Sequence, residues 1–114
     1  MIYRQAEMPV EERARMRGGE GVVLLRHLEK ERLPAAGALF AVLTLAPGCS
    51  IGEHTHTGDT ELLYFVSGEG TALDDGVARP VRAGDAMTTP DGHSHSVVNT
   101  GTEPLVMVAS IIRS

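Results

Sequence analysis

The chain has 114 residues, a length that suits one compact domain able to bury about two thirds of the surface of its unfolded form. Its formal net charge is −5, with 10 basic and 15 acidic residues and no basic cluster after Arg17, which argues against a nucleic-acid-binding surface. No apolar run approaches the roughly 20 residues of a membrane span, and the single cysteine, Cys49, cannot form an intrachain disulfide. We therefore expect a soluble protein of the reducing cytoplasm, with no membrane partner.

The N-terminal part of the chain is charged and differs from the rest. Pro9 suits the first position of a helix, Glu11 would lie in its first turn, and Gly18 would end it. A helix this short is marginal without packing, so a solvated arm is an equal alternative. We expect an N-terminal arm or short helix in residues 1–20 and one β-barrel domain in residues 21–114.

After the arm, the apolar residues recur mainly with a period of two, which is typical of β-strands. The apolar segments are short, rich in Val, Ile, Thr or aromatic residues, and separated by Gly, Pro, Asp or Asn. The expected strands cover residues 22–28, 38–46, 61–67, 70–73, 86–90, 96–99 and 105–112. Turn sequences at 74–76 and 99–101 predict tight hairpins. Many short strands at this spacing predict an all-β sandwich or small barrel.

Four side chains along these strands are candidate metal ligands. Alternate residues of a strand share a face, so His54 and His56 project together and can meet one ion. Glu61 opens the next strand and can lie beside them, while His95 begins a later strand. Three imidazoles and one carboxylate suit one divalent transition metal ion, Mn, Fe, Co, Ni or Zn, with about two open positions. On spacing alone, surface histidines that only form hydrogen bonds are the alternative.

Two segments carry a more specific pattern. Residues 48–68 read Gly, five residues, His-x-His, four residues, Glu, six residues, Gly. Residues 84–99 read Gly, five residues, Pro-x-Gly, two residues, His, three residues, Asn. These segments resemble the two motifs of the cupin superfamily, and the 15 residues between them are similar to the spacing in its small, single-domain microbial members. The resemblance implies a double-stranded β-helix, a jelly-roll-like barrel. It assigns metal-ligand roles to His54, His56, Glu61 and His95.

The resemblance leaves several activities open, because cupins include dioxygenases, oxalate decarboxylases, sugar isomerases, lyases and binding proteins without known turnover. Small domains similar to this one are often described as oxalate-decarboxylase-like. A divalent ion held by one carboxylate and three neutral imidazoles keeps a net charge near +1, which favours an anionic chelator such as oxalate or a 2-oxo acid. We expect a metal-binding protein that binds or acts on a small oxygen-rich acid. The alternatives are a non-catalytic binding or sensing module and a sugar-binding or isomerising cupin.

Turnover would also require a group that transfers protons. Strand parity turns Glu53 and Tyr64 away from the metal ligands, and Asp59 and Asp91 read as turn residues. His93, in the loop of the second motif, is the remaining catalytic candidate. Alternatively, His93 supports a metal ligand through a hydrogen bond or is an ordinary surface histidine in contact with solvent.

The strands at 61–67 and 105–112 are apolar on both faces, which is more than one buried face requires. Proteins cover such faces and exposed strand edges by pairing or by an added segment. We expect a symmetric homodimer in which these outward faces pack together and the arm lies across the partner's sheet. The alternative is a monomer whose own arm covers its own sheet.

Overall fold

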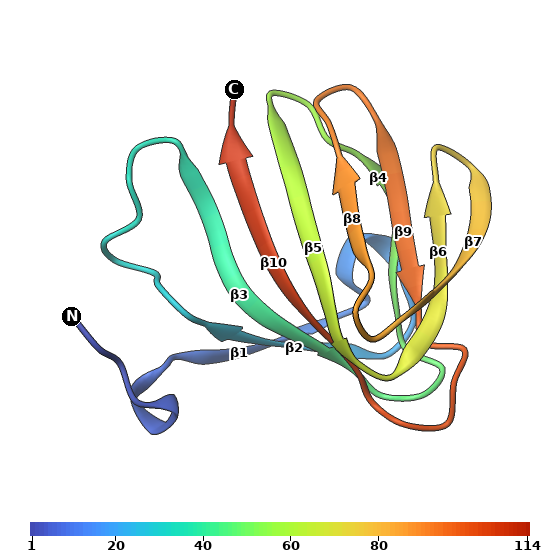
Figure 1. Ribbon diagram of the computed structural model, residues 1–114, viewed down its shortest axis with the longest axis horizontal. Coiled ribbons are helices and arrows are strands. Elements are labelled where there is room, and N and C mark those ends of the chain that lie inside the picture. Colours follow the sequence, from blue (N-terminus) through green and yellow to red (C-terminus); the bar gives the residue numbers. More distant parts are fainter.

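The computed structural model describes residues 1–114 and consists almost entirely of antiparallel β-structure (Figure 1). The elements in chain order are η1 (Gln5–Glu7), β1 (Val10–Ala14), η2 (Met16–Gly18), β2 (Val22–His27), β3 (Gly37–Leu45), β4 (Ser50–Thr55), β5 (Asp59–Ser67), β6 (Glu69–Asp74), β7 (Val77–Arg82), β8 (Ala86–Thr89), β9 (Ser94–Val98) and β10 (Leu105–Arg113). The two η elements are single turns of 3₁₀ helix. None of the helices has the length and apolar character that crossing a membrane requires. The all-β prediction is confirmed.

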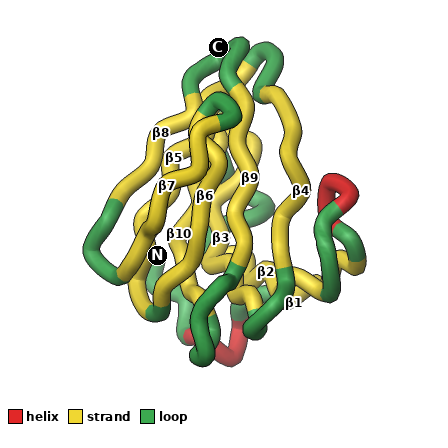
Figure 2. Tube along the Cα trace, turned by 90° about the vertical axis from the view of Figure 1, so that its right-hand side faces the viewer, coloured by secondary structure: helices red, strands yellow, loops and turns green.

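The strands form two sheets that enclose one core. The larger sheet has the order β1-β2-β3-β10-β5-β8, and the smaller one has the order β4-β9-β6-β7, whose strands lie side by side in Figure 2. Buried apolar residues from both sheets form a single cluster, with Phe65 and Met107 from the larger sheet and Val97 from the smaller one. This arrangement of two facing sheets is the expected jelly roll.

Strand β5 shows how the pleat divides the larger sheet into two faces. Glu61, Leu63 and Phe65 point inward and are buried, whereas Leu62 and Tyr64 point outward and are exposed. Because alternate residues of a strand face opposite sides, the apolar outward residues cannot contribute to the core. The prediction that this strand is apolar on both faces, with Tyr64 turned away from Glu61, is confirmed.

The N-terminal segment, for which a short helix or a solvated arm was expected, forms a β-strand. Strand β1 pairs with β2 of the same chain, and η1 precedes it. The helix prediction is wrong because Val10–Ala14 pair with β2 in an antiparallel ladder, and Glu11 contacts His27 at 2.6 Å and Arg13 at 3.1 Å across the strand surface. These hydrogen bonds lower the pKa of the Glu11 carboxyl to about 2, and the bond from Arg13 has the largest effect. The division of the chain at residue 20 stays a prediction.

Two further sequence predictions meet different outcomes. The turn at 74–76 is confirmed as the hairpin between β6 and β7, with Asp75 and Gly76 both at positive φ. The hairpin at 99–101 is wrong, because β9 and β10 belong to different sheets and the chain crosses between them. Asn99 holds this crossing: its amide donates to the carbonyls of Leu45 and Glu103, each at 2.8 Å.

Candidate metal centre

The four predicted ligands meet inside the fold at one end of the two sheets. His54 of β4 lies opposite His95 of β9 in the antiparallel register. The register of β4 shifts between Ile51 and His54. Strict alternation would turn these two side chains to opposite faces, but the shift allows both Ile51 and His54 to face the interior. His56 follows the end of β4, and Glu61 lies near the start of β5 in the opposite sheet. The connection between β4 and β5 therefore brings both sheets to one site.

The donor atoms of this group lie within 4.8 Å of one another. His56 Nε2 is 3.0 Å from Glu61 Oε1 and 3.2 Å from His95 Nε2. His95 Nε2 is 2.9 Å from Glu61 Oε1 and 3.2 Å from His54 Nε2. Adjacent ligands of an octahedral ion with bonds near 2.1 Å are separated by about 3.0 Å, so these distances fit a transition metal. The predicted convergence of the four ligands is confirmed.

Hydrogen bonds behind the ligands set which ring nitrogens face the centre. His54 Nδ1 donates to the carbonyl of Gly52 at 2.8 Å, and His56 Nδ1 donates to Asp59 Oδ1 at 2.7 Å. These acceptors carry no hydrogen, so each Nδ1 is the donor and each Nε2 is the ring nitrogen turned to the centre. His56 Nε2 and Glu61 Oε1 thus face each other at 3.0 Å. Three imidazole nitrogens and one carboxylate at such separations form a donor set that fits a transition metal ion.

Burial also favours the metal-binding form of His54. His56, Glu61 and His95 are buried, and His54 is half-buried. Desolvation is the main cause that lowers the pKa of His54, and the neighbouring charges of His95 and Arg17 lower it further. A lowered pKa favours the neutral imidazole, which is the state that coordinates metal ions.

The structure places His93, the catalytic candidate, on the surface beside the metal centre. Its Nδ1 hydrogen-bonds Asp75 Oδ2 at 2.5 Å, and both side chains are about half exposed. This contact raises the pKa of His93 and lowers that of Asp75. The backbone carbonyl of His93 accepts the N–H of His56 at 2.9 Å. His93 does not join the ligand cluster, and its catalytic role stays a prediction.

Two supporting residues were missed in the sequence. In the sequence, Asp59 was interpreted as a turn residue. Its position three residues after His56 could have indicated the hydrogen bond that the two side chains form within the β4–β5 connection. Thr89 Oγ1 lies 2.7 Å from His95 Nδ1, and both groups are buried. No local signal identifies Thr89, because its position depends on the pairing of β8 with β5, opposite Glu61. Such supporting contacts orient the ligand rings.

Two facing antiparallel sheets with three histidines and one glutamate converging at one end define a cupin domain with a metal-type centre. A family model described as a cupin domain matches residues 41–111, and the chain belongs to this family.

Known proteins extend this similarity over the whole chain. An oxalate-binding protein of Thermotoga maritima is 42% identical over 113 residues, which cover 98% of this chain and 93% of that protein. The crystal structure of a predicted oxalate decarboxylase from Thermotoga maritima has a TM-score of 0.95 and 41% identity, with complete coverage of both chains. The structure of a putative sugar phosphate isomerase from Acidithiobacillus ferrooxidans matches with a TM-score of 0.79 at 23% identity. The match covers 100% of this chain and 75% of the isomerase chain. At that identity, the isomerase shows the fold alone.

Proposed function

We propose that this protein binds oxalate or a similar small chelating acid through one divalent transition metal ion. The observation that carries the proposal is the convergence of four donor atoms, three imidazole nitrogens and one carboxylate oxygen, within 4.8 Å of one another. The metal ligands would be His54, His56, Glu61 and His95. The similarity to the oxalate-binding protein of Thermotoga maritima supports the choice of ligand.

The charge of the site supports an anionic ligand. A divalent ion beside the single Glu61 carboxylate keeps a net charge near +1, and the three imidazoles add none when neutral. When bound, the ion would act as a Lewis acid toward carboxylate oxygens. The protein itself holds the rings in place through Asp59, Gly52 and Thr89, and burial limits the access of water to the ligands. Binding is the proposed function. The dioxygenase, decarboxylase and isomerase activities remain predictions.

Thermal unfolding of the metal-loaded protein tests this function. Oxalate binds only the folded state, so a hundredfold excess over its dissociation constant should stabilise the protein by about 2.7 kcal/mol. Acetate, which has a single carboxylate, should give a much smaller rise in melting temperature at the same concentration. His56→Ala should abolish the response to oxalate. An equal response in this variant would contradict binding through the metal.

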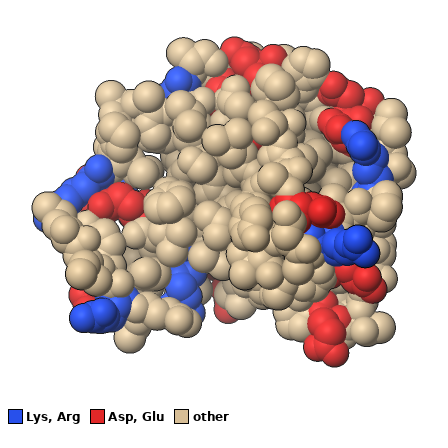
Figure 3. All heavy atoms as spheres, viewed as in Figure 1, with Lys and Arg blue, Asp and Glu red and all other residues tan.

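We further propose that the protein is a cytoplasmic homodimer formed through the outward face of the larger sheet. Phe40, Leu62, Tyr64 and Val66 on this face are each at least 39% exposed. Figure 3 shows a broad area without Lys, Arg, Asp or Glu over β10 and β5. Exposed apolar patches of this kind mark interaction surfaces. Strand β1 pairs with its own chain, so this dimer needs no arm that crosses to the partner.

A further inference from the structure

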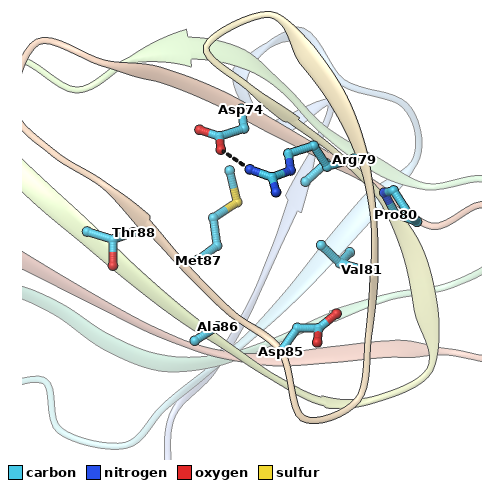
Figure 4. Close-up of a pocket in the computed structure, with 9 residues that line it drawn as sticks. Asp74, Arg79, Pro80, Val81, Asp85, Ala86, Met87 and Thr88 are labelled. Atoms are coloured by element: carbon cyan, nitrogen blue, oxygen red, sulfur yellow. Dashed lines mark hydrogen bonds and ion pairs between the residues drawn. The ribbon is translucent and has the colours of Figure 1, made fainter.

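A cavity of about 360 Å³ opens between the edges of the two sheets, where β6 and β7 face β8. Asp74, Arg79 and Met87 come from these three strands and point toward one another, with Val81 beside them (Figure 4). None of these residues belongs to the metal-ligand cluster. The cavity therefore holds a second set of polar and apolar groups, at the surface between the two sheets.

The strand register places this cavity next to the metal centre. Asp74 lies opposite His95, and residues directly opposite in an antiparallel pair share a face, so Asp74 and this metal ligand are neighbours. On the other wall, Thr89 pairs with Glu61, and Met87 lies two residues before Thr89 on the same face of β8. Two residues that line the cavity, Asp74 and Met87, therefore lie on the strands that carry or adjoin groups of the metal centre.

Arg79 is the cation of this cavity, and most of its donors are free. Its only hydrogen bond is a long one, 3.4 Å from Nη1 to Asp74 Oδ2, and its side chain is 66% exposed. A guanidinium has five N–H donors in a planar fork that matches a carboxylate. Asp85, the other carboxylate of the cavity, already accepts the backbone N–H of Arg82 at 2.9 Å. Arg79 is therefore available to an incoming anion.

The walls beside Arg79 suit a short hydrocarbon stem. Met87 and Val81 are partly buried and pack against the hydrophobic core, so they present apolar surface to the cavity. Methylene groups in contact with such surface lose water at little cost. The cavity thus offers apolar surface and a guanidinium on strands that adjoin the metal centre.

We propose that this cavity is a second subsite for the acid, in which Arg79 binds a distal carboxylate. The ligand class is a 2-oxo diacid: its 2-oxo acid end chelates the metal, its methylene groups contact Met87 and Val81, and its far end reaches Arg79. Asp74 also contacts the guanidinium at 3.4 Å, and the distal carboxylate binds the N–H donors that this contact leaves free. This subsite rests on the proposed function and specifies its substrate class.

Calorimetric titration of the zinc-loaded protein with a matched pair of acids tests the subsite. 2-Oxoglutarate and 2-oxopentanoate have the same chain length, and only the first has a distal carboxylate. A charge-assisted contact with Arg79 should make 2-oxoglutarate bind about tenfold more tightly. Arg79→Met should abolish this preference and leave the affinity for 2-oxopentanoate unchanged.

Arg82→Met is the matched control, since it removes the same charge from the opposite face of β7 and should retain the preference. Circular dichroism checks that both variants are folded. Equal affinities for the two acids in the unaltered protein, or a preference that survives Arg79→Met, would overturn the subsite. If oxalate binds in these cases, the proposed function stands without the subsite. If oxalate and both 2-oxo acids fail to bind, both proposals fall.

Discussion

At the scale of single residues, the proposed metal ligands depend on the groups behind them, and Asp59 is the clearest case. Its carboxylate accepts the Nδ1 hydrogen of the buried His56 and so directs Nε2 toward the other ligands. Asp59→Asn keeps the size of the side chain but removes the charge that fixes the ring. We expect zinc affinity to fall about 10–100-fold, as for other partners of ligand histidines, with no change in the circular dichroism spectrum.

Asp91→Asn is the control for this variant. Asp91 lies in the neighbouring loop, accepts the N–H of Gly58 and the hydroxyl of Ser114, and forms no hydrogen bond to a metal ligand. A competition titration with a zinc-binding dye measures both variants. Similar affinities for Asp59→Asn and the unaltered protein would show that the Asp59 carboxylate does not support the centre.

The four ligands could be predicted from the sequence because short-range geometry places most of them. His54 and His56 are one residue apart, and Glu61 follows a short connection. His95 was a candidate because it begins a later strand, and the resemblance to cupins assigned it to the same site. Asp74 and Arg79 could not be placed, since their relation to the site depends on which residue of β6 pairs with which residue of β9 and β7.

At the scale of elements, strand β4 carries both a metal ligand and a tight packing contact. Gly52 lies where the register of β4 shifts, and its carbonyl accepts the hydrogen of His54 Nδ1. A Cβ atom at Gly52 would collide with the backbone carbonyl of Arg17 in η2, which lies beside β4. This contact explains why a residue without a side chain occupies the shift.

Gly52→Ala should therefore lower both stability and metal affinity. Overpacking against backbone typically costs about 1–3 kcal/mol, and movement of β4 would displace His54. Gly48→Ala is the control: Gly48 has a positive φ but open space around it, so we expect a cost of about 1 kcal/mol with metal affinity unchanged. Urea unfolding and zinc titration separate the two effects. Unchanged zinc affinity in Gly52→Ala would contradict the link between this contact and the centre.

The elements that were mispredicted lie at sheet edges. Strand β1 is the edge of the larger sheet, and its charged sequence resembles a solvated helix more than a strand. Strand β7 is the edge of the smaller sheet and contains Pro80, which edge strands tolerate because one side of their backbone is unpaired. Edge strands have weak apolar alternation, so periodicity alone identifies mainly the central strands.

At the scale of the whole molecule, the outward face of the larger sheet should control assembly. Tyr64 is 51% exposed in β5, between the exposed side chains of Leu62 and Val66. Tyr64→Glu would place a charge in the proposed interface, and its desolvation opposes association. We expect light scattering to give the mass of two chains for the unaltered protein and of one chain for this variant.

Val77→Glu is the control for assembly. Val77 is 61% exposed but lies at the β6–β7 hairpin of the smaller sheet, so the variant should retain the mass of two chains. A mass of one chain for the unaltered protein at micromolar concentration, unchanged on dilution, would exclude the dimer and leave the apolar face for another partner.

The central claim is that His54, His56, Glu61 and His95 hold one metal ion. Elemental analysis tests it directly, after separate incubation with Mn, Fe, Co, Ni and Zn ions and removal of the unbound metal. We predict one ion per chain for the unaltered protein with at least one of these metals, and a large loss of bound metal in His56→Ala at an unchanged circular dichroism spectrum. Absence of bound metal from the unaltered protein after every incubation would contradict the claim.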